Sequence, residues 1–85
     1  MYYVYILRSR KYKDKIYIGF TSNLRKRLKQ HSIGMSCTTR KMLSVELVYC
    51  EAYKSKADAQ ARERRLKQYG NALGHLKKRI SNSLA

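Results

Sequence analysis

Acidic residues are scarce in this sequence, with five aspartates and glutamates against twenty lysines and arginines and a formal net charge of +15. The positive charge is spread along all 85 residues, which argues against a basic tail attached to a neutral domain. A chain with this charge calls for a polyanionic partner, and the phosphate backbone of nucleic acid is the commonest one. An anionic membrane surface is the weaker alternative.

Proline is absent, and no apolar run is long enough to span a membrane, because the longest extends only from Tyr2 to Leu7. That run also lacks the basic leader and the cleavage site of a signal peptide, so we expect a cytoplasmic protein without a membrane partner. Cysteine occurs twice, as Cys37 and Cys50, without the closely spaced partners of a zinc site. We interpret both as reduced structural thiols, since a disulfide would require an oxidising compartment.

Apolar residues make up 44% of the sequence and include eight tyrosines, which is typical of an ordered protein and not of a disordered tail. The length predicts one small domain over residues 1–85. Hydrophobic periodicity predicts the order strand, strand, helix, strand, helix, helix. The first five elements are expected at residues 2–8, 15–20, 23–33, 45–52 and 56–69. This order allows an α+β fold, a small three-stranded, largely antiparallel sheet flanked by helices.

Alternation along the first two strands, which we expect to form a hairpin, allows Tyr5 and Tyr17 to lie on one face of the sheet. In the third strand the same rule sets Val45, Leu47 and Tyr49 against Val48 and Cys50.

Capping residues mark the expected helix ends. Ser22 is the candidate cap of the first helix and Gly34 its C-terminal residue, with a loop over 35–43. Ser55 with Asp58 resembles a capping box, and Gly70 supplies a stop. A last helix follows Asn71 as its cap, with an apolar stripe that reaches Leu84.

Three residues in the expected helices stand out as candidates for chemistry. Arg27 and His31 lie four residues apart, so both project from one helix face. The strand that carries Tyr17 leads directly into that helix, and a short turn can bring the phenol beside the guanidinium. Glu63 lies at the margin of the core-facing stripe of its helix, whereas an acid that only adds solubility would point outward.

These residue types match the needs of phosphodiester hydrolysis, which requires a deprotonated nucleophile and positive charge on the phosphorane oxygens. Glu63 can hold one Mg²⁺ that keeps most of its waters. Arg27 can clamp the scissile phosphate. His31 or a tyrosine phenol can accept a proton from the attacking water, although a nearby cation must first lower a phenol's pKa from about 10. The spacing leaves the choice of base open.

In order and spacing, these residues resemble the GIY-YIG endonuclease superfamily over nearly the whole chain. The resemblance rests on Tyr3-Val4-Tyr5, Tyr17-Ile18-Gly19, Arg27, His31 and Glu63. It is closest to small single-domain bacterial members, in which YIG-x-T-x-x-L-x-x-R-x-x-x-H is followed by a late Glu and a Lys one turn beyond it. Those last two positions are Glu63 and Lys67 here.

The resemblance implies a metal-dependent endonuclease, with one divalent ion, Mg²⁺ or Mn²⁺, bound by Glu63. It also implies that the scissile phosphate is surrounded by Tyr5, Tyr17, Arg27 and His31. DNA is the expected substrate, with structure-specific cleavage in repair or recombination as one setting, and a protein partner or a homodimer as a source of selectivity. We further expect substrate contacts from Gly19, Arg25, Lys26 and Lys67.

The chain departs from the family pattern in the first motif, where Tyr3 and Val4 stand in place of glycine and isoleucine. Phe20 stands where relatives carry lysine, and the active-site asparagine of many relatives has only Asn71 as a loose counterpart, at a different spacing.

A second interpretation is a non-catalytic nucleic-acid-binding module, in which tyrosines stack on bases and basic helices follow the backbone. Taken singly, each candidate has a plain structural explanation. Glu63, for example, can be the acidic half of an i,i+4 pair with Lys67. Only their joint occurrence favours the enzyme.

Overall fold

The sheet has three antiparallel strands in the order β2-β1-β3, with β1 in the centre. The computed structural model describes residues 1–32, 44–68 and 70–85. The strands are β1 (Tyr2–Ser9), β2 (Ile16–Thr21) and β3 (Val45–Tyr53). The three described helices are α1 (Leu24–Ser32), α3 (Lys56–Gln68) and α4 (Gly70–Arg79). The predicted α+β fold and element order are therefore confirmed.

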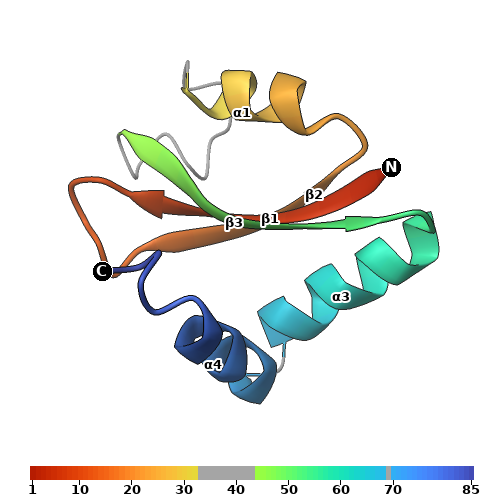
Figure 1. Cartoon of the computed structure of the whole chain (residues 1–85). Helices are drawn as coiled ribbons and strands as arrows, with labels where there is room; N and C mark the ends of the chain where they lie inside the picture. The colour runs from red at the N-terminus through yellow and green to blue at the C-terminus, as the bar shows by residue number, and fades with distance from the viewer. Residues whose placement is uncertain (33–43, 69) are drawn as a thin grey trace.

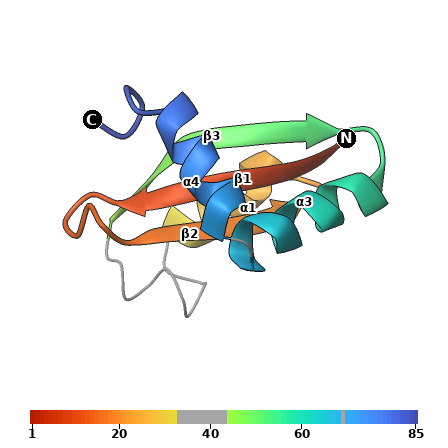
Figure 2. The ribbon, with the colours of Figure 1, turned by 90° about the horizontal axis from the view of Figure 1, so that it is seen from below.

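The helices cover the two faces of the sheet unequally (Figure 1). α1 lies over one face, and α3 and α4 lie side by side under the other, as the view from below also shows (Figure 2). The hydrophobic core fills the space between the sheet and the α3–α4 layer; its buried members are Val4, Ile6, Ile18, Ala59, Leu66 and Leu76. The opposite face of the same strands is left for other side chains, among them the two motif tyrosines.

The β1–β2 hairpin has the predicted pairing. Tyr5 is opposite Gly19 and Leu7 is opposite Tyr17, so Tyr5 and Tyr17 share a face, as strand alternation allowed. Their rings lie 6.2 Å apart between centroids. This face is the one covered by α1.

The third strand does not follow simple alternation. A register shift between Ile6 and Leu7 pairs Ile6 with Tyr49 and Leu7 with Leu47, which leaves Val48 unpaired in the described β1–β3 register. Because a bulge inserts one extra residue, the side chains beyond it change face. Val48 and Tyr49 therefore both pack against the core, and Leu47 is 40% exposed. The predicted facing of Val45, Leu47 and Tyr49 against Val48 and Cys50 was wrong.

Two of the predicted helix caps also need correction. The Oδ1 atom of Asn23 accepts a hydrogen bond from the backbone N–H of Lys26 at 3.1 Å, so Asn23 caps α1 in place of Ser22. Gly70 is the first residue of α4, so Asn71 lies inside the helix and does not cap it. Gly34 and the loop over 35–43 fall outside the described residues.

The remaining expectations for the helices are closer. The Ser55 Oγ atom accepts from the N–H of Asp58 at 3.3 Å, which confirms the cap of α3. α4 ends at Arg79 and continues as turns, in which the N–H of Leu84 donates to the carbonyl of Ile80 at 3.1 Å. The apolar stripe predicted to reach Leu84 therefore lies on α4 only as far as Arg79, and its remaining residues lie in the turns.

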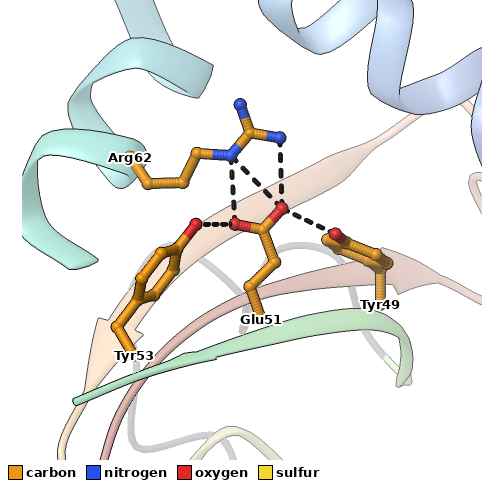
Figure 3. A network of polar contacts seen from close by, with 4 residues as sticks. All are labelled: Tyr49, Glu51, Tyr53 and Arg62. Carbon is orange, nitrogen blue, oxygen red and sulfur yellow. Dashed lines mark hydrogen bonds and ion pairs between the residues drawn. The ribbon is translucent and has the colours of Figure 1, made fainter. Parts of the chain in front are cut away.

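A polar network fastens α3 to β3 (Figure 3). The Glu51 carboxylate accepts from Arg62 through Nε at 3.0 Å and Nη2 at 3.1 Å, and from the phenol of Tyr49 at 2.6 Å. The phenol of Tyr53 donates to its other oxygen. Charge-assisted bonds of this kind are stronger than neutral ones. The network thus holds Arg62, the residue before Glu63, against β3.

Candidate active site

Three of the predicted residues form a chain of close polar contacts between β1 and α1. The phenolic oxygen of Tyr5 lies 2.9 Å from Nε2 of His31 and 3.4 Å from Nε of Arg27. Tyr5 has no exposed surface, and His31 is 2% exposed. Arg27 is partly exposed, so the chain of contacts leads from the surface into the protein.

The local structure of α1 explains how Arg27 and His31 come together. They are one helical turn apart, and both project from one face of α1 toward Tyr5, as their spacing predicted. Gln30 accepts a hydrogen bond from Nη1 of Arg27 at 3.1 Å and steadies the guanidinium. Sequence reasoning missed Gln30, for which the i,i+3 spacing to Arg27 was the available signal.

Gly19 makes room for Tyr5. A Cβ atom at position 19 would lie 2.3 Å from Cζ and 2.4 Å from the phenolic oxygen of Tyr5, well inside van der Waals contact. The two residues are paired across β1 and β2, so the tyrosine ring lies directly over the glycine. Gly19 is itself buried. A side chain at this position would collide with Tyr5, which explains why the motif has a glycine here.

Tyr17 and Lys67 complete one wall of the cluster. The Tyr17 ring centroid is 5.1 Å from that of His31, and the Lys67 ammonium lies 5.8 Å from the Tyr17 ring. Tyr17 belongs to the edge strand β2, whereas Lys67 belongs to α3 on the other face of the sheet. The two faces therefore meet at the β2 edge.

Glu63 reaches this edge from α3. Its side chain is 21% exposed, and Oε2 lies 3.4 Å from Nζ of Lys67. Lys67, the partner of Glu63, also lies 5.8 Å from the Tyr17 ring, so the carboxylate shares a neighbour with the cluster. Glu63 is thus partly buried, and its described link to the cluster runs through Lys67 to Tyr17.

The electrostatics fix the resting protonation of the cluster. Burial raises the pKa of Tyr5, against an opposing effect of the Arg27 hydrogen bond. Burial, helped by the Arg27 charge, lowers the pKa of His31. Near neutral pH Tyr5 is therefore a phenol and His31 is neutral, and the Arg27 Nε–H donates to the Tyr5 oxygen. The tautomer of His31 decides whether the Tyr5 hydroxyl donates to Nε2 or accepts from it. The hydrogen bond from Arg27 to Tyr5 raises the pKa of Arg27, which stays charged.

The other expected substrate contacts are on the surface of α1. Lys26 is exposed and lines a shallow pocket of about 550 Å³ together with Arg27 and Gln30. Arg25 is exposed and lines a different hollow. Asn71, the loose counterpart of the family asparagine, lies in a pocket between α3 and α4 that contains none of the five candidate residues.

Within the described residues no group of three or more His, Cys, Asp or Glu side chains could hold a metal ion. Glu63 is linked to the cluster through Lys67. A metal held by Glu63 alone would have one protein carboxylate and would take its remaining ligands from water and substrate. Nor is any helix in the described part of the chain long and apolar enough to cross a membrane.

Residues 1–81 match the sequence-family model of the GIY-YIG catalytic domain. The chain belongs to the GIY-YIG family. Membership in this family suggests a nuclease and a nucleic-acid substrate. No solved structure matches the chain significantly.

Relatives of this GIY-YIG domain include several proteins named UPF0213. One from Clostridium perfringens is 42% identical over 69 residues, which cover 80% of this chain and 72% of the relative. One from Streptococcus pneumoniae is 37% identical over 67 residues, covering 78% and 66%. One from Oceanobacillus iheyensis is 38% identical over 68 residues, covering 79% and 77%.

Proposed function

We propose that this GIY-YIG domain is a metal-dependent endonuclease that hydrolyses phosphodiester bonds in DNA. The observation that carries the proposal is the contact chain from Arg27 through Tyr5 to His31, with distances of 3.4 Å and 2.9 Å. A buried phenol that contacts both a cation and a neutral imidazole can do more than fill the core. It is suited to moving a proton.

In the proposed reaction Tyr5 and His31 act as one proton acceptor. Because Tyr5 is enclosed at rest, the attacking water must enter beside Arg27, the partly exposed end of the contact chain. As that water gives a proton to the phenolic oxygen, the phenol gives its own proton to Nε2 of His31, which becomes an imidazolium. The water oxygen bonds to phosphorus, and the bond to the leaving oxygen breaks. The leaving group departs as an alkoxide and takes a proton from solvent water. The lowered pKa of His31 keeps it neutral and ready to accept, and the raised pKa of Tyr5 prevents loss of its proton at rest.

Arg27 and Tyr17 are assigned to the phosphate. The guanidinium stays charged and is partly exposed, so it can donate to the oxygens that gain charge in the transition state. Tyr17 forms the adjacent wall with its ring between His31 and Lys67. Lys26 and Arg25 extend the positive surface for the rest of the strand.

Glu63 would hold the divalent ion, Mg²⁺ or Mn²⁺. Glu63 fits this role because its side chain is partly exposed. Among the described residues, the ammonium of Lys67 is the only cation paired with the Glu63 carboxylate. Single-carboxylate sites suit magnesium, which keeps several waters. When bound, such an ion stabilises negative charge on phosphate oxygens.

The substrate class follows from charge. A formal charge of +15 favours a long polyanion over a small phosphate ester. DNA is the proposed substrate, with selectivity for particular structures in repair or recombination and with a protein partner or a second copy as its source. The cytoplasm is the proposed location.

The test uses labelled duplex, branched and single-stranded DNA, and the corresponding RNA, incubated with Mg²⁺, with Mn²⁺ or with EDTA. We expect metal-dependent cleavage by the parent chain, none by Glu63→Gln, and equal binding by both. Arg27→Ala should lower turnover by about two to three orders of magnitude, as loss of one transition-state donor typically does. Lys77→Ala, an exposed charge on α4, is the control and should change turnover little.

The alternative is a binding module without catalysis, favoured by the Glu63–Lys67 ion pair, which neutralises the carboxylate without any metal. Salt-dependent binding that is unchanged by EDTA, with no cleavage of any substrate, would establish the module and refute the enzyme.

A further inference from the structure

A second basic site lies between α3 and α4, outside the candidate active site. The two helices enclose an open pocket of about 460 Å³. Its polar lining consists of Arg62, Arg65, Asn71, His75 and Arg79. None of the described carboxylates lines it, and none of the five candidate catalytic residues does.

The lining residues are spaced for one continuous groove. Asn71, His75 and Arg79 follow one another at intervals of four, so they form a single stripe along α4. Arg62 and Arg65 are three apart on α3 and form the facing stripe. Asn71, His75, Arg65 and Arg79 are all exposed, so their polar groups are open to a ligand.

Positive charge in the pocket is only partly compensated. Glu51 lies beneath it and is bound by Arg62. Asp58 lies beside it, in a neighbouring hollow that also includes Arg62 and Arg65. Neither Arg65 nor Arg79 makes an ion pair within residues 1–32, 44–68 and 70–85. The pocket therefore has the positive charge and the hydrogen-bond donors that an anion would need.

Arg62 is held ready for a ligand. Its Nε and Nη2 atoms are bonded to Glu51, while Nη1 is turned away from the carboxylate and has no contact with the residues drawn (Figure 3). The network thus removes the rotamer freedom that a mobile arginine would lose on binding. A planar fork with a fixed position is well suited to a phosphate oxygen.

We propose that this pocket binds a backbone phosphate of the same nucleic acid whose scissile phosphate lies at Arg27. The inference rests on the proposed nucleic-acid substrate. Arg62 and Glu63 are consecutive on α3, and consecutive helical residues point about 100° apart. They therefore leave α3 on different flanks, with Glu63 toward the β2 edge and Arg62 toward α4.

The width of α3 predicts the distance between the two sites. A helix with its side chains is about 10–12 Å across, and phosphates of one strand rise about 3.4 Å per step. The rise per step is a lower limit on the spacing of successive phosphates, so the second phosphate should lie no more than roughly three nucleotides from the bond that is cut. Exposed Arg64 lies on the path over the helix between them.

The test measures binding in EDTA, so that its result does not depend on cleavage. The double variant R65Q/R79Q is compared with K77Q/K78Q, which removes the same charge from the exposed outer side of α4. Affinity for a labelled duplex is determined by anisotropy at several salt concentrations. Two lost phosphate contacts should reduce the slope of log affinity against log salt by about 1.8. The ratio of the parent's duplex affinity to that of R65Q/R79Q should then fall roughly tenfold between 50 and 200 mM salt.

A second pair of variants adds charge in place of removing it. His75→Glu places one carboxylate in the pocket, and Asn82→Glu places one on the exposed turn after α4. His75→Glu should weaken duplex binding by the larger factor. Melting curves on all four variants should resemble that of the parent, because the substituted side chains are exposed.

Equal salt slopes for R65Q/R79Q and K77Q/K78Q, or equal effects of His75→Glu and Asn82→Glu, would overturn the proposal. A third result would also overturn it. If R65Q/R79Q lost binding to inorganic phosphate, or to anionic phospholipid vesicles, while its duplex affinity stayed unchanged, the pocket would serve a free anion or a membrane. Failure of the parent to cleave DNA while R65Q/R79Q shows the expected slope would refute the proposed enzyme and leave the phosphate site standing.

Discussion

Replacing Gly19 by alanine tests the packing on which the candidate site depends. The new methyl carbon would lie 2.3 Å from Cζ, 2.4 Å from the oxygen and 2.8 Å from Cε1 of Tyr5. To restore contact distances the ring must move by about 1 Å. Tyr5 has no exposed surface, and its oxygen is already bonded to His31 at 2.9 Å. The ring has no free space into which it can move.

The expected cost combines two effects. Overpacking a well-filled site costs about 1–3 kcal/mol, and loss of the buried hydrogen bond to His31 adds about 0.5–1.5 kcal/mol. Gly19→Ala should therefore destabilise the protein by about 2–4 kcal/mol and lower Tm by roughly 10–30 °C for a chain of this size. Thermal unfolding followed by circular dichroism measures this loss, and cleavage should fall with it.

A double-mutant cycle identifies the cause. Tyr5→Leu removes the ring atoms that would clash, so Gly19→Ala in that background should cost less than about 0.5 kcal/mol. Gly74→Ala is the control, because this exposed glycine in α4 has no described atom within 4 Å of its added methyl. It should stabilise the helix by about 0.5–1 kcal/mol. An unchanged Tm for Gly19→Ala, or the same loss in the Tyr5→Leu background, would refute the packing argument.

Two further predictions concern pH and the α3 anchor. The pKa of His31 is lowered by burial and by Arg27, so the folded state binds this proton less well than the unfolded state. Stability should fall as pH drops below about 6.5 toward the lower folded pKa, and His31→Gln should flatten that part of a Tm–pH curve; an unchanged curve would contradict the assignment. Glu51→Gln should cost about 2–4 kcal/mol in urea unfolding, because Arg62 loses its charged partner. Burial raises the pKa of Glu51, but the hydrogen bonds from Arg62 and two tyrosines outweigh burial, so the pKa in the folded state is lowered. The stabilisation is therefore present above about pH 4.5, the ordinary pKa, and is lost as the pH falls through the lower pKa of the folded state. A variant as stable as the parent would show that the network does not hold α3.

The arrangement of the sheet explains how one small fold assembles the site. β1 is central and carries Tyr5, while β2 is an edge strand and carries Tyr17. An edge strand lets residues from both faces approach each other around it. His31 arrives from α1 on one face, and Glu63 arrives from α3 on the other.

Much of this was determined by the sequence alone, because it depends on neighbours along the chain. Period-two alternation within each strand allowed Tyr5 and Tyr17 to share a face, and the i,i+4 spacing was enough to align Arg27 with His31. The order of the six elements followed from the same periodicities. Short-range rules settle such features before any tertiary contact forms.

The tertiary structure decided what depends on contacts between distant segments. The bulge at Val48 arises from the fit of β3 to β1, and the choice of Asn23 over Ser22 as cap depends on how the chain leaves β2. The position of Arg62, the residue before Glu63, depends on the Glu51–Arg62 anchor, whose partners are eleven residues apart in sequence and belong to different elements. No local pattern encodes these contacts, since each requires the packed sheet and helices to exist first.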